Sequence, residues 1–210
     1  MIKLKELLEL RNMVYAESVR PKDEKRMSRK LELWDENLVL PKRQPPENDS
    51  SLTLKEIKYL SNVEPNEKFA TSHDDVVDSF MELIEKNSLD ISKKDIKKIV
   101  KESVKFIMEL KYHYNRPRPF QVAEFYNIDL NGTTLDSMKT PSYPSGHAIQ
   151  GYLIGEYLSF KDPSNSEEYL GKGNDIAESR IVAKAHYPSD RDYGKQVAKV
   201  LFRGMKKWHH

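Results

Sequence analysis

One long run of helical periodicity constrains the fold of this chain more than any other feature. It begins at Ser92, a residue type that caps helix starts, with Asp95 three positions later, and it continues to about Tyr114. Apolar residues recur through it at the spacing of one helix face, at Ile96, Ile99, Val100, Val104, Ile107 and Met108. The sequence Arg116-Pro117-Arg118-Pro119 ends it, because proline cannot continue a helix. The pattern therefore predicts a long helix with one buried face.

The rest of the chain shows the same periodicity, and no strand-like alternation of useful length. Further helices are expected over about 2–18, 27–38, 53–62, 73–87, 146–160, 166–186 and 188–207, with loops over 41–51 and up to about 144. Within the third of these, Thr53 and Glu56 have the spacing of a capping box. We therefore predict an all-α helical bundle, in which residues 1–210 form a single domain.

Composition excludes several classes of protein. Lys and Arg number 35 and Asp and Glu 33, which gives a net charge of +2 and no reason to expect a nucleic-acid partner. With no cysteine, disulfides, thiolate metal sites and cysteine nucleophiles are ruled out. No run of about 18 apolar residues predicts membrane insertion. The first residues alternate apolar and charged side chains, unlike a signal peptide, so a cytoplasmic protein is expected.

Three short segments carry residue types that could bind a tetrahedral anion. Lys111 and Arg118 lie at the end of the long helix and in the loop that follows, and Arg180 comes late in the chain. Ser145 and Gly146 lie at a predicted helix start, where free N–H groups and the helix dipole favour an anion. Two arginines, a lysine, a hydroxyl group and helix-start amides would together form a phosphate site. The direction in which Arg116 points is left open.

Two histidines could supply the reactivity of such a site. His186 and Asp190 are four residues apart, so that Asp190 could accept a hydrogen bond from one ring nitrogen and leave the other free to attack phosphorus. His147 follows the helix-start residues and could protonate the leaving oxygen. Because the cations would offset the charge of the transferring group, we expect no metal and no cofactor, although phosphate or vanadate could occupy the site.

Each segment has a simpler explanation when it is taken alone. A Pro-Ser-Gly turn before a helix is common, and a Lys or Arg near a helix end usually interacts with the helix dipole in solvent. His186 and Asp190 could be an ordinary surface pair on a helix. The conjunction of all three segments favours the catalytic interpretation, since each supplies a different part of one site.

These segments resemble the signature motifs of the type 2 phosphatidic acid phosphatase superfamily, which includes class A nonspecific acid phosphatases and vanadium-dependent haloperoxidases. The family pattern is K-x6-RP, PSGH and SR-x5-H-x3-D. All its fixed positions are present here, at Lys111, Arg118, Pro119, Pro144 to His147, Ser179, Arg180, His186 and Asp190. The resemblance implies an all-α fold, His186 as nucleophile and His147 as general acid. The matched span is about 80 of the 210 residues, all in the C-terminal half. Residues 91–210 are therefore expected to hold the catalytic helices and loops, and residues 1–90 form a helical part without motifs.

The resemblance leaves more than one activity open. The lipid phosphatases of the superfamily are integral membrane proteins, so the lack of a spanning segment favours a small phosphomonoester, nucleotide or pyrophosphate as substrate. Vanadate-dependent halide oxidation is a second hypothesis, although the haloperoxidases of this superfamily are generally much larger. A phosphate-binding module without catalysis is a third. In this sequence we favour a metal-independent phosphatase.

Two features outside the motifs are assigned no chemistry. His73, Asp74 and Asp75 have metal-like residue types, but acidic residues at a helix start already favour the helix dipole. The charged N-terminal half could serve as a helical cap or as the surface of a homo-oligomer.

Overall fold

The long helix predicted from the sequence is α6, Lys93–Tyr114, in the computed structural model, which describes residues 4–206. Ser92 and Asp95 form a capping box at its start, in which each side chain accepts a hydrogen bond from the other residue's main-chain N–H. Asn115 ends the helix in the left-handed conformation. The buried face carries Ile96, Ile99, Phe106, Ile107 and Met108.

The described residues, 4–206, are helices and connecting segments, without a strand, which confirms the predicted all-α fold. In chain order the other α-helices are α1 (Leu4–Arg11), α2 (Pro21–Met27), α3 (Ser51–Asn62), α4 (Glu67–Ser72), α5 (Val76–Lys86), α7 (Pro119–Phe125), α8 (Gly146–Lys161), α9 (Ser166–Val182) and α10 (Pro188–Arg203). Two short 3-10 helices are η1 (Asp136–Met138) and η2 (Pro163–Asn165). None of these helices is long and apolar enough to cross a membrane.

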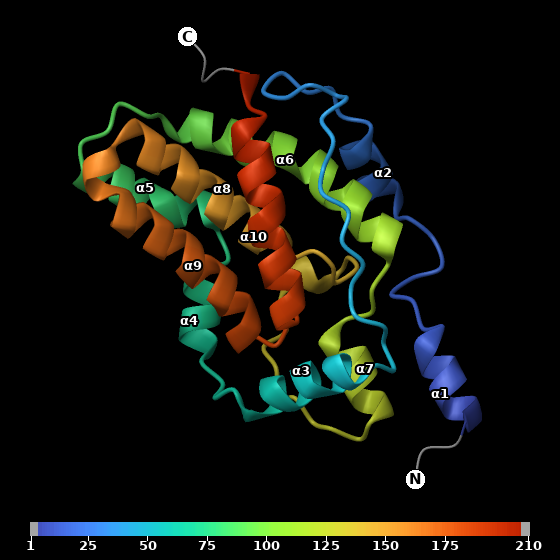
Figure 1. The fold of residues 1–210 in the computed structure, drawn as a ribbon. Helices are drawn as coiled ribbons and strands as arrows, with labels where there is room; N and C mark the ends of the chain where they lie inside the picture. The colour runs from blue at the N-terminus through green and yellow to red at the C-terminus, as the bar shows by residue number, and fades with distance from the viewer. Residues whose placement is uncertain (1–3, 207–210) are drawn as a thin grey trace.

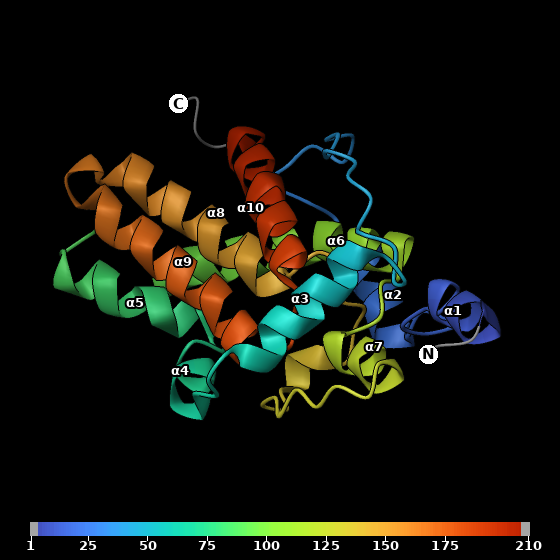
Figure 2. The same ribbon diagram turned by 60° about the horizontal axis from the view of Figure 1, so that its bottom comes forward.

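Helices α8 and α9 run side by side, and α10 packs against α8 (Figures 1 and 2). Two glycines bring the first pair into backbone contact. A Cβ atom on Gly151 would lie 2.9 Å from the main-chain oxygen of Gly173, and one on Gly173 would lie 2.6 Å from that of Gly151. Only a residue without a side chain fits at either position.

The hydrophobic core lies between these helices and their neighbours α5 and α6. Its fully buried side chains include Phe80, Ile96, Leu153, Ile154, Tyr169, Ile176, Val197 and Leu201. A smaller cluster joins α1, α3 and α7 to the segment before α10, around Leu10, Ile57, Leu60, Val122 and Tyr187. The core therefore continues beneath the segments that carry the motifs.

The first half of the chain is less helical than its periodicity predicts. The helix expected over 2–18 ends at Arg11, since the Asn48 side chain donates hydrogen bonds to the carbonyls of Leu10, Arg11 and Met13. The prediction of a helix over 27–38 is wrong, because α2 ends at Met27 and the residues that follow are not helical. Trp34 is nevertheless buried, as predicted for an inward-facing residue, and donates to the carbonyl of Leu201 over 2.7 Å.

A carboxylate from α6 explains why the segment after α2 is irregular. Glu102 accepts hydrogen bonds of 2.8 Å from the main-chain N–H groups of Glu32 and Leu33, and so supplies the partners that a helix would otherwise provide. The predicted capping box of α3 is also wrong. Ser50 is the N-cap, with its hydroxyl accepting from the N–H of Thr53, and Glu56 is buried against other partners.

Two further differences lie close to the motifs. The segment expected to be a loop up to about residue 144 contains α7 and η1, and Pro119 occupies the first turn of α7. The helix expected over 166–186 ends at Val182. Lys184 has a φ of 57°, and the chain turns there before α10 begins at Pro188, as predicted. This turn places His186 in a connecting segment between two helices.

Candidate active site

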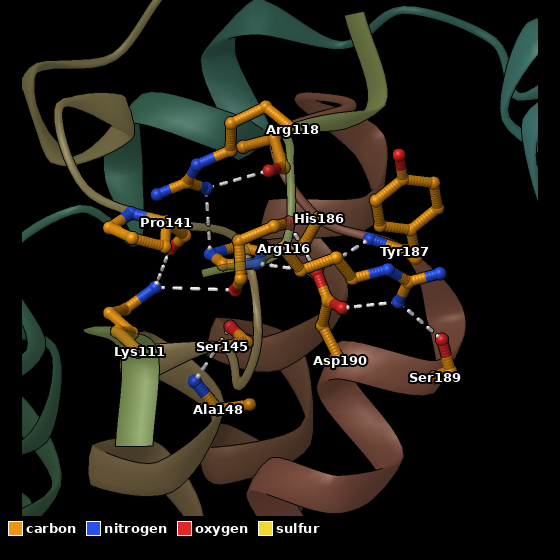
Figure 3. A network of polar contacts seen from close by, with 12 residues as sticks. Lys111, Arg116, Arg118, Pro141, Ser145, Ala148, His186, Tyr187, Ser189 and Asp190 are labelled. Carbon is orange, nitrogen blue, oxygen red and sulfur yellow. Dashed lines mark hydrogen bonds and ion pairs between the residues drawn. The ribbon is translucent and has the colours of Figure 1, made fainter. Parts of the chain in front are cut away.

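His186 and Asp190 form a buried pair at the start of α10. The Nδ1 atom of His186 lies 3.0 Å from Oδ2 of Asp190, and both side chains are almost fully buried. A carboxylate at Nδ1 fixes the hydrogen on that nitrogen and leaves a lone pair on Nε2. Figure 3 shows the pair beside the side chains that surround it.

Arg118, a cation of the first motif, contacts the second ring nitrogen of His186, and Lys111, the other cation, lines the same cavity as His186. Arg118 Nη1 lies 3.0 Å from His186 Nε2 and also donates to the carbonyl of Ala185 over 2.7 Å. Lys111 Nζ donates to the carbonyls of Pro141 and Ser142 at 2.5 and 3.2 Å (Figure 3). Both cations are buried, with carbonyl groups rather than carboxylates as their partners. Within residues 4–206, no direct ion pair therefore neutralises their positive charge.

The other two motifs meet at a carboxylate that belongs to neither. Arg180 Nη1 lies 2.6 Å from Oδ1 of Asp74, and the same oxygen lies 3.3 Å from Nε2 of His147. His147 Nε2 is also 3.0 Å from the main-chain oxygen of Asp74. Arg180 additionally donates to the carbonyl of Ala70 in α4. Asp74 thus holds the second histidine and the late arginine on one side of the site.

Asp190 is also fixed by other buried groups besides His186. Arg116 Nη1 lies 2.7 Å from Oδ1 of Asp190, and Arg116 Nη2 lies 3.1 Å from Oε2 of Glu56 in α3. The hydroxyl of Ser142 donates to Asp190 Oδ2 over 2.5 Å. Arg116, whose direction the sequence left open, therefore points to two buried carboxylates. It also packs over the ring of Tyr187 at 3.7 Å.

A cavity of about 450 Å³ opens at this cluster. From the motifs, Lys111, Gly146, His147 and His186 line it. A Cβ atom on Gly146 would lie 3.2 Å from Ile107 and 3.8 Å from Lys111, so the glycine keeps the first turn of α8 close to the lysine. The volume is that of a small-molecule site.

The structure brings the predicted site residues into one region, although they do not all face the cavity. Arg118 does not line the cavity but contacts His186, which does. Arg180 likewise pairs with Asp74, which in turn contacts the cavity residue His147. Ser145 is the N-cap of α8, and its hydroxyl accepts from the N–H of Ala148 over 3.3 Å. Its own N–H donates to the carbonyl of Asp190, which ties the second motif to the third.

Burial and charge shift the pKa values of these groups in a consistent direction. Burial, followed by the Arg118 charge, holds the pKa of His186 well below its usual value. Burial lowers the pKa of Lys111 well below its usual range and that of Arg118 to about 10. Burial alone would raise the pKa of Asp190, but the Arg116 charge and the bonds from His186 and Ser142 outweigh it and keep this carboxyl ionised. The nucleophile candidate is therefore a neutral imidazole beside a carboxylate.

The pKa values of His147 and Asp74 are lowered as well. Burial lowers the pKa of His147 below its ordinary value, while the hydrogen bond that His147 donates to Asp74 opposes that shift. The hydrogen bond with His147 and the charges of His147 and Arg180 lower the pKa of Asp74 to about 2. Asp74 is therefore an anion at every pH at which the protein is expected to work.

Asp74 and Glu56 are the site residues that sequence reasoning missed. Asp74 was considered only as an acidic residue at a helix start, and this explanation holds for its neighbour: Asp75 is the N-cap of α5 and accepts from the N–H of Asp78. No spacing links Asp74 to Arg180, since the two residues are 106 positions apart. Within residues 4–206, no group of three or more His, Asp or Glu side chains could hold a metal ion.

Comparison with known proteins places this geometry in context. A non-specific acid phosphatase of Salmonella typhimurium is 34% identical over 97 residues, which cover 46% of this chain and 38% of that protein. A non-specific acid phosphatase of Providencia stuartii is 36% identical over 90 residues, covering 42% of this chain and 35% of that protein. The matched region thus spans less than two fifths of the length of these relatives.

The fold is similar to that of a protein solved as the first bacterial vanadium-dependent iodoperoxidase. The TM-score is 0.55 at 16% sequence identity, over 80% of this chain and 53% of that one. At this identity the likeness concerns the fold alone. The sequence model of the PAP2 superfamily matches residues 99–210. Because that match takes in just over half of the chain, from the second turn of α6 onward, this chain belongs to the PAP2 superfamily.

Proposed function

We propose that this protein is a metal-independent phosphatase that hydrolyses small phosphomonoesters through a phosphohistidine on His186. One observation carries the proposal: His186 has its Nδ1 bound to a buried carboxylate and its Nε2 beside Arg118, at a cavity that Lys111 and His147 also line. A neutral, oriented imidazole next to unneutralised cations suits attack on a phosphate dianion. The names of the acid phosphatases that it resembles favour the same class of reaction.

The first step forms a bond between His186 Nε2 and phosphorus and breaks the bond between phosphorus and the ester oxygen. The incoming phosphoryl group takes over the donors of Arg118 and Lys111, which in this structure contact Nε2 of His186 and main-chain carbonyls. The amides at the start of α8 and the Arg180 guanidinium add to the stabilisation of its charge. Asp190 stabilises the positive charge that develops on His186.

His147 supplies the proton for the departing alcohol. Both partners of its Nε2 are oxygens of Asp74, so Nε2 keeps its hydrogen and the transferable proton is the one on Nδ1. In the second step the neutral Nδ1 accepts a proton from water, the water oxygen bonds to phosphorus, and the bond to His186 breaks. Inorganic phosphate leaves and both histidines return to their starting states.

The test is hydrolysis of an aryl phosphate in the presence of EDTA. We expect turnover with a neutral-to-acid optimum, because His147 must carry a proton while His186 stays neutral. A requirement for added magnesium, or a rate that still rises at pH 9, would contradict the mechanism. Quenching with alkaline detergent during turnover of a ³²P-labelled substrate should trap alkali-stable phosphate on the protein, and later treatment with acid should release it.

Vanadate separates this proposal from halide oxidation in the same cavity. As an analogue of phosphate, it should inhibit the hydrolysis competitively. A gain of peroxide-dependent halogenation without any phosphatase activity would favour the haloperoxidase alternative. Mixed vesicles that contain phosphatidic acid, compared with a water-soluble monoester, test the lipid-phosphate alternative in the same way.

A further inference from the structure

One wall of the cavity comes from α2, a helix outside the motifs. Arg20, Lys22 and Arg26 line the cavity from this helix and from the residue before it. They face the same space as Lys111, His147 and His186. None of the three is needed for the chemistry proposed above. The cavity therefore carries more positive charge than a single phosphate group requires.

The two arginines of this wall are held in place by a buried carboxylate. Asp23 is fully buried and lies 2.7 Å from Arg20 through Oδ2 and 2.7 Å from Arg26 through Oδ1. The hydroxyl of Tyr112, in α6, donates to the same carboxylate over 2.7 Å. Side chains fixed in this way lose little freedom when they bind a ligand, which favours a preformed site.

The segment that leads into α2 is also fixed to the site. The N–H of Tyr15 donates to the carbonyl of Asn115 at 3.0 Å, and the Asn115 side chain donates to the carbonyl of Ala16 at 2.7 Å. The hydroxyl of Tyr15 donates to the carbonyl of Met138 at 3.0 Å. These bonds join the first part of the chain to the end of α6 and to η1, on either side of the cavity.

The charges of this wall do not cancel. Arg20, Lys22 and Arg26 carry three positive charges against the single negative charge of Asp23, which leaves two. Lys139 and Asp136, which also line the cavity, form an ion pair of 2.6 Å and neutralise each other. Glu24, the other acid of α2, does not line the cavity. The excess fits a second dianionic group.

We infer that Arg20, Lys22 and Arg26 bind a second phosphate group, so that the preferred substrates are small molecules with two phosphate groups, one at His186 and one at α2. The inference rests on the proposed function, because it takes the cavity as the place where a phosphate ester binds. Esters with two phosphates on one carbon skeleton and diphosphates share this chemistry. They differ in the distance between the two phosphorus atoms.

Binding of phosphonates tests the inference without turnover, because their carbon–phosphorus bonds cannot be hydrolysed. Isothermal titration calorimetry in EDTA would compare methylphosphonate with methylene-, propane-1,3- and pentane-1,5-bisphosphonate. We expect at least one bisphosphonate to bind about tenfold tighter or more than methylphosphonate, the size of one or two charge-assisted contacts. The length that binds best distinguishes a diphosphate from a bisphosphate ester. The advantage should shrink at high salt.

Three variants test the basic residues of the wall, and a fourth serves as a control. Lys22→Gln changes an exposed side chain, and Arg20→Gln and Arg26→Gln each leave Asp23 with one arginine and Tyr112. Each should reduce the advantage of the bisphosphonate by about threefold to tenfold and weaken methylphosphonate by a smaller factor. Arg203→Gln, at the exposed end of α10 and outside the cavity, should change neither affinity.

The outcomes separate this inference from the proposed function. If methylphosphonate binds and the aryl phosphate is hydrolysed, but no bisphosphonate binds more tightly, the inference is overturned and the proposed function stands. Equal weakening of both ligands in the variants, or an equal effect of Arg203→Gln, also overturns it. If no phosphonate binds and no ester is hydrolysed, both fail. Circular dichroism of each variant shows whether the fold is retained.

Discussion

The two halves of this chain contribute to the site in different ways. Residues 91–210 supply the side chains that would contact a phosphoryl group, and all of them lie in recognisable motifs. Residues 1–90 carry no motif, yet they provide Asp74, Glu56 and the basic wall of α2. The reaction restricts the residue type where bonds are made and broken. A positioning carboxylate needs only to reach its partner, so many places in the chain can supply it.

The largest effect is expected from the nucleophile itself. His186→Ala should lower kcat/KM for an aryl phosphate by about 10³-fold or more, because no other imidazole lies beside both Asp190 and Arg118 in the described part of the chain. His113→Ala is the matched control, since His113 is exposed on the same helix as Lys111 and does not line the cavity. Comparable losses in the two variants would show that the C-terminal motifs do not hold the chemistry.

A second test asks whether the two halves depend on each other for stability. Arg116→Met removes the cation between Glu56 and Asp190 and leaves two buried carboxylates without it. We expect the free energy of unfolding to fall by about 3 kcal/mol or more. Urea denaturation measures it, with Lys5→Met as control, because the pair of Lys5 and Glu9 is exposed and worth less than about 0.5 kcal/mol. A loss below 1 kcal/mol would contradict a structural role for this link.

A third test concerns the carboxylate that sequence reasoning missed. Asp74→Asn should lower kcat by about tenfold, less than the 10²–10⁴ that a general acid contributes. The hydrogen bond and charge of Asp74 raise the pKa of His147, so the variant should lose its active protonated form at a lower pH. The alkaline limb of the kcat profile should therefore move to lower pH. Asp75→Asn, which keeps the helix cap, should leave that limb in place.

The smallest effect concerns stability in acid. The pKa of Asp74 is held at about 2 in the folded protein, against an ordinary value of 3.8. A carboxyl group whose pKa is lower in the folded protein stabilises the fold at pH values above its pKa in the unfolded chain. That stabilisation is lost as the pH falls from about 4 towards 2. Wild type should therefore exceed Asp74→Asn in free energy of unfolding at pH 5 by more than it does at pH 3. A difference that is equal at the two pH values would place Asp74 outside this ion pair.

The sequence was sufficient for the fold class, and it named the C-terminal residues that the structure brings into one region, because helical periodicity and motif spacing are local signals. It was insufficient wherever a side chain from elsewhere decides the backbone. Glu102 replaces the hydrogen bonds of the helix expected over 27–38, and Asn48 ends the one expected over 2–18. The same limit applies to Asp74, whose partner Arg180 is far along the chain. Contacts between residues far apart in the chain produce no periodic pattern in the sequence, so periodicity could not predict them.

The contact between Gly151 and Gly173 has a consequence far from where it occurs. His147 lies in the first turn of α8 and Arg180 lies in the last turn of α9. The alignment of these two antiparallel helices therefore fixes the distance between the proposed proton donor and the proposed anion-binding residue. A methyl group at either glycine would push α8 and α9 apart or shift one helix along the other. Such a change would alter catalysis without touching a single group that meets the substrate.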